Sequence, residues 1–419
     1  MKEFRFIHTA DWHGDSDPIK QRKLEASLGQ MVDYCQVNKV NAIIISGDVW
    51  EKKQSYADNS GVPMVITYLR HLSRLVDFIF IVKGNNSHDE PGSISLLHQM
   101  ESNIYAYESP TILGIIGNNT VVDLVKPSAE VEPDYIISLF PYPTKAALLN
   151  VNSIDGSNED YIQVLESILR MIGNVHIKYN VPKIFGFHGN VQGTRLSSGQ
   201  TLLSQDIIVS PFTLQLAMAD YYALGHIHLA QKVFYHGYYS GSIYNKNWGE
   251  TEQKSFNVIK FVELHADDDR EENQFDEEIT DSGEYFIFIN KVPLTAARPM
   301  ISISGTFNEG KVDSTQELSA DEIDAIVQGN AEVRLKIKVN ENDRKLITAT
   351  TEEELKKQFG EDVKIEWDVV PVERESRSEQ IMSCRSYVDE VVEYAAVIGE
   401  EVPDSVKVKV EEIQQEAGL

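Results

Sequence analysis

Short apolar runs, each followed within a few residues by Asp, Asn or His, recur through residue 228. They are the segments 4–7, 42–45, 78–82, 184–187 and 221–224. A buried strand that ends in a loop places such a polar residue at the rim of a sheet, on a rigid scaffold where sites are built. Several strand ends must therefore meet at one rim, and this requirement constrains the fold more than any other feature of the sequence.

The N-terminal region alternates strand patterns with helix patterns. Segments 4–8, 42–46 and 78–82 have the composition of buried strands. Between them, apolar residues recur at helical spacing in segments 24–35 and 65–76. This alternation predicts a parallel sheet with helices on its faces. Strand patterns then continue to residue 289, with one clear helix at about residues 158–172. We therefore expect an α/β fold, a two-sheet sandwich with flanking helices, over residues 1–294.

The pattern changes near residue 295. Segments 300–304, 333–339 and 365–370 alternate like half-exposed strands. Short helices are expected at two pairs with capping-box spacing, Ser319 with Glu322 and Thr351 with Glu354. Together these elements predict a small α/β domain over residues 295–372.

Residues 373–419 form a tail with a third pattern. A first helix, capped by Ser376 and Glu379, is expected to carry an apolar stripe: Ile381, Cys384, Val388, Val391 and Ala395. A second short helix is expected after Pro403. Two amphipathic helices beyond a charged linker either pack on the body or bind another protein, and we favour a protein partner.

The composition indicates a soluble, multidomain protein of a reducing compartment. The chain has 419 residues, 42% of them hydrophobic and 25% charged, which is too long for one ordinary core. It has no apolar signal region and no run long enough to cross a bilayer, and its two cysteines lie far apart. We therefore expect a cytoplasmic protein without a membrane partner. The net charge of −27 argues against a broad basic surface for nucleic acid, but bound cations can hold phosphates at a carboxylate-lined site.

Seven residues at the predicted strand ends carry metal-ligating groups. They are Asp11, His13, Asp48, Asn85, His188, His226 and His228. Any one of these histidines alone is best explained as a core or surface residue. Together the seven make a nitrogen and oxygen set without thiolate, which suits manganese, iron or zinc better than calcium. A carboxylate such as Asp48 can bridge two ions about 3.5–4 Å apart, which is the arrangement that supports in-line phosphoryl displacement.

The order and spacing of these motifs resemble a known superfamily. Asp-x-His, Gly-Asp, Gly-Asn, a lone His and Gly-His-x-His are similar to the motifs of the calcineurin-like metallophosphoesterases, over residues 1 to about 290. The opening segment, residues 7–14, is most similar to the SbcD family, the nuclease half of a DNA double-strand-break repair complex whose ATPase half is SbcC. The size and acidity resemble the recombination endonuclease subunits of large bacteriophages.

This resemblance implies a ligand set, an activity and partners. Asp11, His13, Asp48 and His228 are expected to hold one ion, and Asp48 with Asn85, His188 and His226 the other. The ions are expected to be manganese, with magnesium as the alternative. The implied activity is manganese-dependent DNA exonuclease and endonuclease cleavage in end processing, recombination and repair.

The resemblance also assigns roles to the remaining domains. Residues 295–372 are expected to be a DNA-capping domain, and residues 373–419 a helical tail that binds an SbcC-like ATPase. The implied partners are double-stranded DNA ends and that ATPase, with the chain as a homodimer within a heterotetramer. The implied location is the bacterial host cytoplasm if the chain is encoded by a phage.

The sequence departs from the family at the position of the catalytic acid. The family usually has Gly-Asn-His-Asp, whereas here the stretch is Gly84-Asn85-Asn86-Ser87-His88-Asp89. An ungapped alignment places Asn86 at the acid position, and an amide has no proton to donate at neutral pH. The alternative treats Asn86 and Ser87 as an insertion, so that His88 is the acid. We favour the ungapped alignment, because an insertion beside a metal ligand is expected to displace the acid from hydrogen-bond reach.

Two other functions remain open on sequence alone. A phosphatase or cyclic-nucleotide phosphodiesterase would use the same metal chemistry and would not need the small domain or the tail. A catalytically silent DNA-end scaffold would keep the fold and lack the acid.

Overall fold

The computed structural model describes most of the chain. The described residues are 3–51, 60–117, 119–125, 130–144, 158–197, 200, 207–250, 252–263, 280–281, 285–296, 298–308, 310–314, 316–360, 363–371, 381 and 383–417. Two compact units divide the chain: Met1–Ser302 with Leu318–Arg334, and Ile303–Glu317 with Leu335–Leu419. The domain boundaries after residues 294 and 372 stay predictions, and residues 372 and 373 lie outside the described part.

The first large sheet has the order β15-β16-β14-β1-β2-β3-β4. Its strands are β1 (Glu3–Thr9), β2 (Ala42–Ile45), β3 (Phe78–Val82), β4 (Ile104–Tyr107), β14 (Ser255–Glu263), β15 (Thr280–Asp281) and β16 (Tyr285–Pro293). Strands β1 to β4 are parallel, and β14 and β16 complete the sheet in antiparallel pairs. The carboxyl ends of β1, β2 and β3 therefore lie at one edge, as the sequence predicts.

The second large sheet has the order β12-β13-β11-β8-β7-β5-β6. Its strands are β5 (Thr111–Ile116), β6 (Thr120–Asp123), β7 (Tyr135–Phe140), β8 (Lys183–His188), β11 (Tyr221–Gly225), β12 (Gln231–Phe234) and β13 (Gly237–Tyr239). Strands β7, β8, β11 and β13 are parallel neighbours. A separate pair, β9 (Asn190–Val191) and β10 (Ile208–Val209), follows β8 in the loop region.

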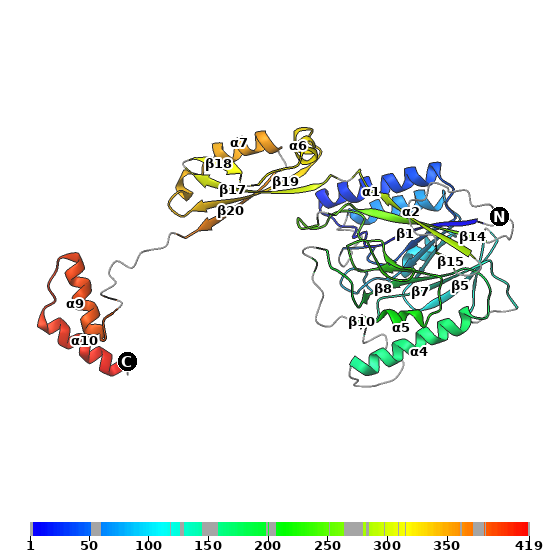
Figure 1. The fold of residues 1–419 in the computed structure, drawn as a ribbon, viewed down its shortest axis with the longest axis horizontal. Helices are drawn as coiled ribbons and strands as arrows, with labels where there is room; N and C mark the ends of the chain where they lie inside the picture. The colour runs from blue at the N-terminus through cyan, green and yellow to red at the C-terminus, as the bar shows by residue number, and fades with distance from the viewer. Residues whose placement is uncertain are drawn as a thin grey trace. The chain divides into compact units, whose positions relative to one another are not determined.

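The two sheets pack face to face with helices on both outer faces (Figure 1). Phe6, Ile44 and Phe80 of the first sheet share a buried cluster with Ile137 and Ile184 of the second. Helices α1 (Pro18–Val37) and α2 (Gly61–Ser73) cover the first sheet, and α4 (Asn158–His176) and α5 (Pro211–Gln215) cover the second. This arrangement confirms the predicted α/β two-sheet sandwich with flanking helices.

Local sequence signals explain where α1 begins and which face it buries. The Asp17 side chain accepts hydrogen bonds from the backbone N–H groups of Ile19 and Lys20, and Pro18 occupies the first helical position. Four of the five residues of the predicted apolar stripe are buried, Leu24, Leu28, Met31 and Cys35, and the fifth, Val32, is partly buried. The stripe faces the first sheet because residues three and four apart lie on one side of a helix.

The small sheet has the order β18-β17-β19-β20. Its elements are β17 (Met300–Asn308), β18 (Lys311–Ser314), α6 (Ala320–Val327), β19 (Glu332–Asn340), α7 (Ala349–Phe359) and β20 (Lys364–Val370). The predicted capping box of Ser319 with Glu322 is confirmed at α6. The second predicted box is wrong, because α7 begins three residues earlier: Thr348 caps it, and Thr351 is the reciprocal partner.

The tail contains α9 (Tyr387–Ile398) and α10 (Asp404–Ala417). The single helix predicted from Ile381 to Ala395 is wrong, because residues 383–386 are not helical and the Ser386 side chain caps a new helix through the N–H of Asp389. The predicted caps Ser376 and Glu379 lie outside the described residues. Across the described ranges, none of the helices combines the length and apolarity that crossing a membrane requires.

Two helical glycines give a matched test of the packing. A Cβ at Gly173 in α4 would lie 2.2 Å from the Leu216 carbonyl oxygen, whereas one at Gly29 in α1 would meet only the Tyr68 hydroxyl at 3.8 Å. We expect Gly29→Ala to raise the free energy of unfolding by about 0.5–1 kcal/mol. Gly173→Ala should lower it by about 1–3 kcal/mol. Thermal unfolding of both variants checks this, and a gain from both would contradict the packing of α4 on α5.

Candidate metal centre

All seven predicted ligands lie at or just beyond strand ends along one edge of the sandwich. Asp11 and His13 follow β1, Asp48 follows β2, Asn85 follows β3, His188 ends β8, and His226 and His228 follow β11. Apart from Asn85, which is half-buried, their side chains are buried. The structure therefore brings residues from both sheets to one place, as the sequence predicts.

The loops that carry these residues have an uncommon backbone conformation. Asp11, His13, Asp48 and His226 have φ angles of 54°, 46°, 51° and 102°. A left-handed conformation costs a non-glycine residue on the order of 1–3 kcal/mol and persists only where the surroundings enforce it. Here the loop after β1 is hydrogen-bonded to the loop after β2. The N–H of Asp11 donates to the Gly47 carbonyl and that of His13 to the Asp48 carbonyl, both at 3.0 Å.

Two positions next to predicted ligands must be glycine, because other atoms lie too close for a Cβ. A Cβ at Gly84 would lie 2.0 Å from Oδ1 of Asp48, and a Cβ at Gly225 would lie 1.9 Å from the Ser46 carbonyl oxygen. The glycines of the Gly-Asn and Gly-His-x-His motifs therefore let the end of β3 and the end of β11 approach the loop after β2.

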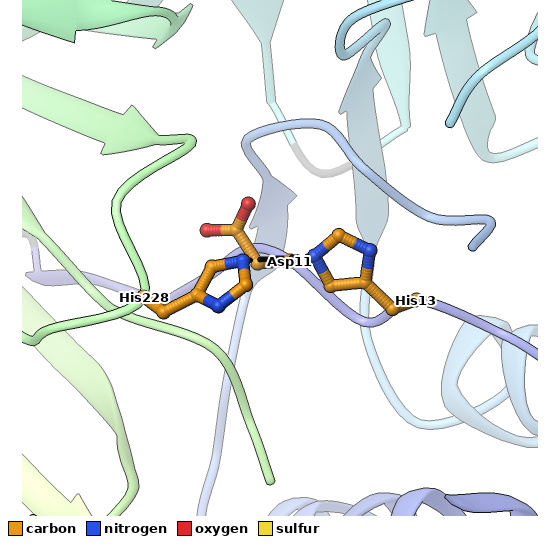
Figure 2. A group of neighbouring side chains, drawn as sticks. All are labelled: Asp11, His13 and His228. Carbon is orange, nitrogen blue, oxygen red and sulfur yellow. Dashed lines mark hydrogen bonds between the residues drawn. The ribbon is translucent and has the colours of Figure 1, made fainter. Parts of the chain in front are cut away.

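One group of ligands, called here group one, contains Asp11, His13 and His228 (Figure 2). The side chains converge, and Nε2 of His13 lies 3.1 Å from Nε2 of His228. Two imidazole nitrogens that face each other at this distance need a proton or a cation between them, since each otherwise presents a lone pair. A carboxylate oxygen of Asp11 and one ring nitrogen from each of His13 and His228 all lie within 4.8 Å of one another.

Group two contains Asp48, His188 and His226, again with ligand atoms within 4.8 Å of one another. Nε2 of His188 lies 3.3 Å from Oδ1 of Asp48. Asn85 is held beside this group, since its backbone N–H donates to Oδ1 of Asp48 at 3.1 Å. Oδ2 of Asp48 also lies 4.0 Å from Nε2 of His13 in group one, so Asp48 stands between the two groups.

The electrostatics of the centre favour cations. Burial raises the pKa of the Asp11 carboxyl. Although burial acts to lower it, Asp48 and Asp11 raise the pKa of the His188 imidazole to about 9. Without a metal, a proton on His188 therefore offsets the buried carboxylates at neutral pH, and a divalent ion would displace that proton. Buried carboxylate and imidazole groups that converge in this way, with the half-buried Asn85 beside them, fit divalent metal ions.

Two glutamates that no sequence motif indicated lie beside imidazoles of group one. Oε2 of Glu51 lies 3.1 Å from Nδ1 of His13, and Oε1 of Glu250 lies 3.3 Å from Nδ1 of His228. Burial alone would raise the pKa of Glu250, but the hydrogen bond with His228 and the charge of Lys254 lower it to about 2. The only sequence feature that could have indicated Glu51 is its position three residues after Asp48. No neighbouring residue in the sequence indicates that Glu250 lies at the metal centre.

The structure separates the two candidates for the catalytic acid. Asn86 is exposed, and its Oδ1 accepts a hydrogen bond from Nζ of Lys83. His88 instead lies beside the metal groups, with Nε2 3.9 Å from Oδ2 of Asp48 and its ring centroid 4.6 Å from that of His13. The N–H groups of His88 and Asp89 both donate to the Asn85 carbonyl. This turn carries Asn86 outward and His88 inward, so the geometry favours the alternative that the sequence analysis ranked second.

The shared position of Asp48 generates a prediction about stoichiometry. We expect the wild-type chain to bind two divalent ions and Asp48→Ala to bind neither with measurable affinity, because one carboxylate serves both groups. Asp33→Ala, at an exposed carboxylate of α1, is the control and should bind as wild type does. Metal analysis after dialysis, with thermal unfolding of the ion-free variants, checks this. Full occupancy in Asp48→Ala would contradict a shared ligand.

Comparisons with known proteins place this centre in a family. The family model of calcineurin-like phosphoesterase matches residues 4–230, more than half of the 419 residues. A solved structure described as GAP50, the anchor in the inner membrane complex of Plasmodium, has 13% identity and a TM-score of 0.37, covering 62% of this chain and 81% of that chain. A second crystal structure has 11% identity and a TM-score of 0.32, with 62% and 95% covered. Both likenesses are too weak to bear on function, whereas the family match includes every predicted ligand, and the chain belongs to the calcineurin-like phosphoesterase family.

Proposed function

We propose that this metal-dependent phosphoesterase is a DNA nuclease of the SbcD type, which hydrolyses phosphodiester bonds at double-stranded DNA ends. The observation that carries the proposal is that two ligand groups, joined by Asp48, have the imidazole of His88 beside them. The similarity of residues 7–14 to the SbcD family supports the choice of DNA among phosphodiesters.

Bound divalent ions would supply an activated water and stabilise charge on the phosphoryl oxygens, and manganese is the ion we propose. The protein's own residues set the positions of the groups that would bind these ions. Oδ1 of Asp48 is held by the backbone N–H of Asn85 and lies 3.3 Å from the imidazole of His188. The left-handed backbone at Asp11 and His13 fixes their side chains before any substrate arrives. This preorganisation is what an in-line displacement requires.

We assign the general acid to His88. Its Nδ1 donates to the backbone carbonyl of Glu51, which orients the ring and leaves Nε2 directed to the centre near Asp48. The side chain is 24% exposed, so the imidazole can exchange its proton with water between turnovers. A proton on Nε2 is placed to reach the leaving oxygen of the phosphodiester, a contribution typically worth ~10²–10⁴-fold in rate.

The small sheet offers a surface for DNA. Lys336 and Lys338 of β19 are exposed and two residues apart, so they project from one face, while Leu335, Ile337 and Val339 are buried on the other. Positive charges on the exposed face suit phosphate contacts in spite of the net charge of the chain. This surface supports the proposal that residues 295–372 act as a DNA-capping domain.

The tail supports a protein partner. Large apolar side chains of α9 and α10 are exposed: Tyr387, Val392, Tyr394, Val397, Ile398, Val406, Val408 and Ile413. A concentration of exposed apolar residues on two short helices indicates an interaction surface. We propose that this surface binds an SbcC-like ATPase, with the chain as a homodimer within a heterotetramer that works in the cytoplasm of a bacterial host.

The substrate and the acid are tested together. With manganese and linear duplex DNA, we expect His88→Ala to lower the rate of cleavage by ~10²–10⁴-fold, because the leaving oxygen loses its proton donor. Asn86→Ala should change the rate less than threefold, and Asn86→His should not raise it by orders of magnitude. Metal analysis of each variant separates loss of the acid from loss of the ions.

The outcomes distinguish the candidate functions. Cleavage of a chromogenic phosphodiester without cleavage of DNA would favour a small-molecule phosphodiesterase or phosphatase. Ion binding without hydrolysis of either substrate would favour a DNA-end scaffold. A large gain from Asn86→His with no loss from His88→Ala would return the acid position to Asn86.

The prediction for the tail concerns binding of the chain to the ATPase. A chain that ends at residue 371 should keep ion binding and phosphoesterase activity but lose co-purification with the ATPase, since the proposed binding surface is absent. The matched control is the full chain with Val408→Ser and Ile413→Ser, which should weaken association without removing the helices. If the shortened chain still co-purifies, the tail helices instead pack within the molecule.

A further inference from the structure

The two histidines of group one share an arrangement of their outer nitrogens. Nε2 of His13 and Nε2 of His228 face each other within the metal centre, 3.1 Å apart. Nδ1 of His228 shares a hydrogen bond with Oε1 of Glu250, and Nδ1 of His13 lies 3.1 Å from Oε2 of Glu51. A carboxylate at the outer nitrogen of a ligating imidazole fixes its tautomer and raises its basicity toward the metal.

Both carboxylates are held by lysines of one short segment. We call residues 245–250 and 252–254 the backing segment. Nζ of Lys246 lies 2.7 Å from Oε2 of Glu51, and Nζ of Lys254 lies 2.7 Å from Oε2 of Glu250. These groups are deeply buried, since the side chains of Glu250, Lys254 and Lys246 are 0%, 3% and 9% exposed.

The backing segment is itself organised around Glu250. The backbone N–H of Lys246 and Nδ2 of Asn247 each donate to the Glu250 carboxylate at 3.2 Å. Nζ of Lys254 also donates to the backbone carbonyl of His228 at 3.2 Å. The segment therefore fixes Glu250, the backbone of His228 and, through Lys246, the carboxylate behind His13.

Group two is supported differently. Nδ1 of His188 lies 2.6 Å from the backbone carbonyl oxygen of Ser46, which carries no net charge. A carbonyl also orients an imidazole, but it raises the basicity of the ring less than a carboxylate does. Behind the imidazole of His188 there is thus a neutral carbonyl, whereas carboxylates lie behind the imidazoles of His13 and His228.

We propose that Glu250 and Glu51 are positioning residues for the ion of group one, and that the backing segment sets the affinity of that ion separately from the ion of group two. The inference rests on the two-ion centre proposed above and not on DNA as the substrate. It follows that the ions differ in how strongly they depend on the backing segment, and that a change in this segment can empty one position while the other stays filled.

The test is a calorimetric titration of the full, ion-free chain with manganese alone. Wild type should show two binding events. Glu250→Gln and Glu51→Gln should each weaken one event by about 10–100-fold and leave the other within twofold. Because Gln is close in size to Glu, the variants remove the charge with little change in packing, and thermal unfolding of the ion-free protein monitors the fold.

Two further variants identify the affected position. Glu252→Gln removes a carboxylate that also lies 2.7 Å from Nζ of Lys254 but contacts Ser197 instead of an imidazole, so both events should stay within twofold of wild type. In an Asp11→Asn background, which lacks a ligand of group one, Glu250→Gln should have no further effect on the remaining event.

Equal weakening of both events by Glu250→Gln, or no weakening by either glutamate variant, would overturn the inference. If Glu252→Gln acts as strongly as Glu250→Gln, the loss comes from Lys254, and the positioning role assigned to Glu250 is overturned. No substrate is present in the titration, so failure of the proposed nuclease activity leaves these outcomes unaffected. Failure of wild type to bind two ions would instead reject the two-ion centre itself.

Discussion

A buried carboxylate, Asp48, is the constraint on which the rest of the centre depends. A charge taken out of water costs several kcal/mol unless opposite charge lies beside it. Here the imidazole of His188, whose pKa Asp48 and Asp11 raise, lies 3.3 Å from Oδ1 of Asp48. Although burial acts to raise it, His188 and His88 hold the pKa of the Asp48 carboxyl well below its usual range. The ends of β1, β2, β8 and β11 meet around this charge.

The features that sequence predicts well are those decided by local periodicity. The strands and the apolar stripe of α1 follow from which residues must be buried, and the shared position of the seven predicted ligands at one edge follows from their place after buried strands. Helix starts are predicted less well. Serine and threonine recur near each start, and only the folded backbone decides whether Thr348 or Thr351 becomes the cap. The start of α9 was missed for the same reason, because Ser386 caps this helix although Ser376 was predicted as a cap.

Contacts between segments far apart in the sequence could not be predicted. Glu250 is 22 residues from His228, and no pattern distinguishes it from the other acidic residues of the chain. The case of His88 shows a second limit. An insertion beside Asn85 was expected to displace the acid, but a turn onto the Asn85 carbonyl places His88 near Asp48. Backbone hydrogen bonds, which an alignment does not contain, determine this placement of His88.

The central claim is that two ions share Asp48, with a separate set of imidazoles around each. Its most direct test is anomalous diffraction at the manganese edge from crystals soaked in manganese. The account predicts two peaks about 3.5–4 Å apart, one among Asp11, His13 and His228 and one among Asn85, His188 and His226, with a carboxylate oxygen of Asp48 ligating both. A single peak, or two peaks of which only one is ligated by Asp48, would contradict it.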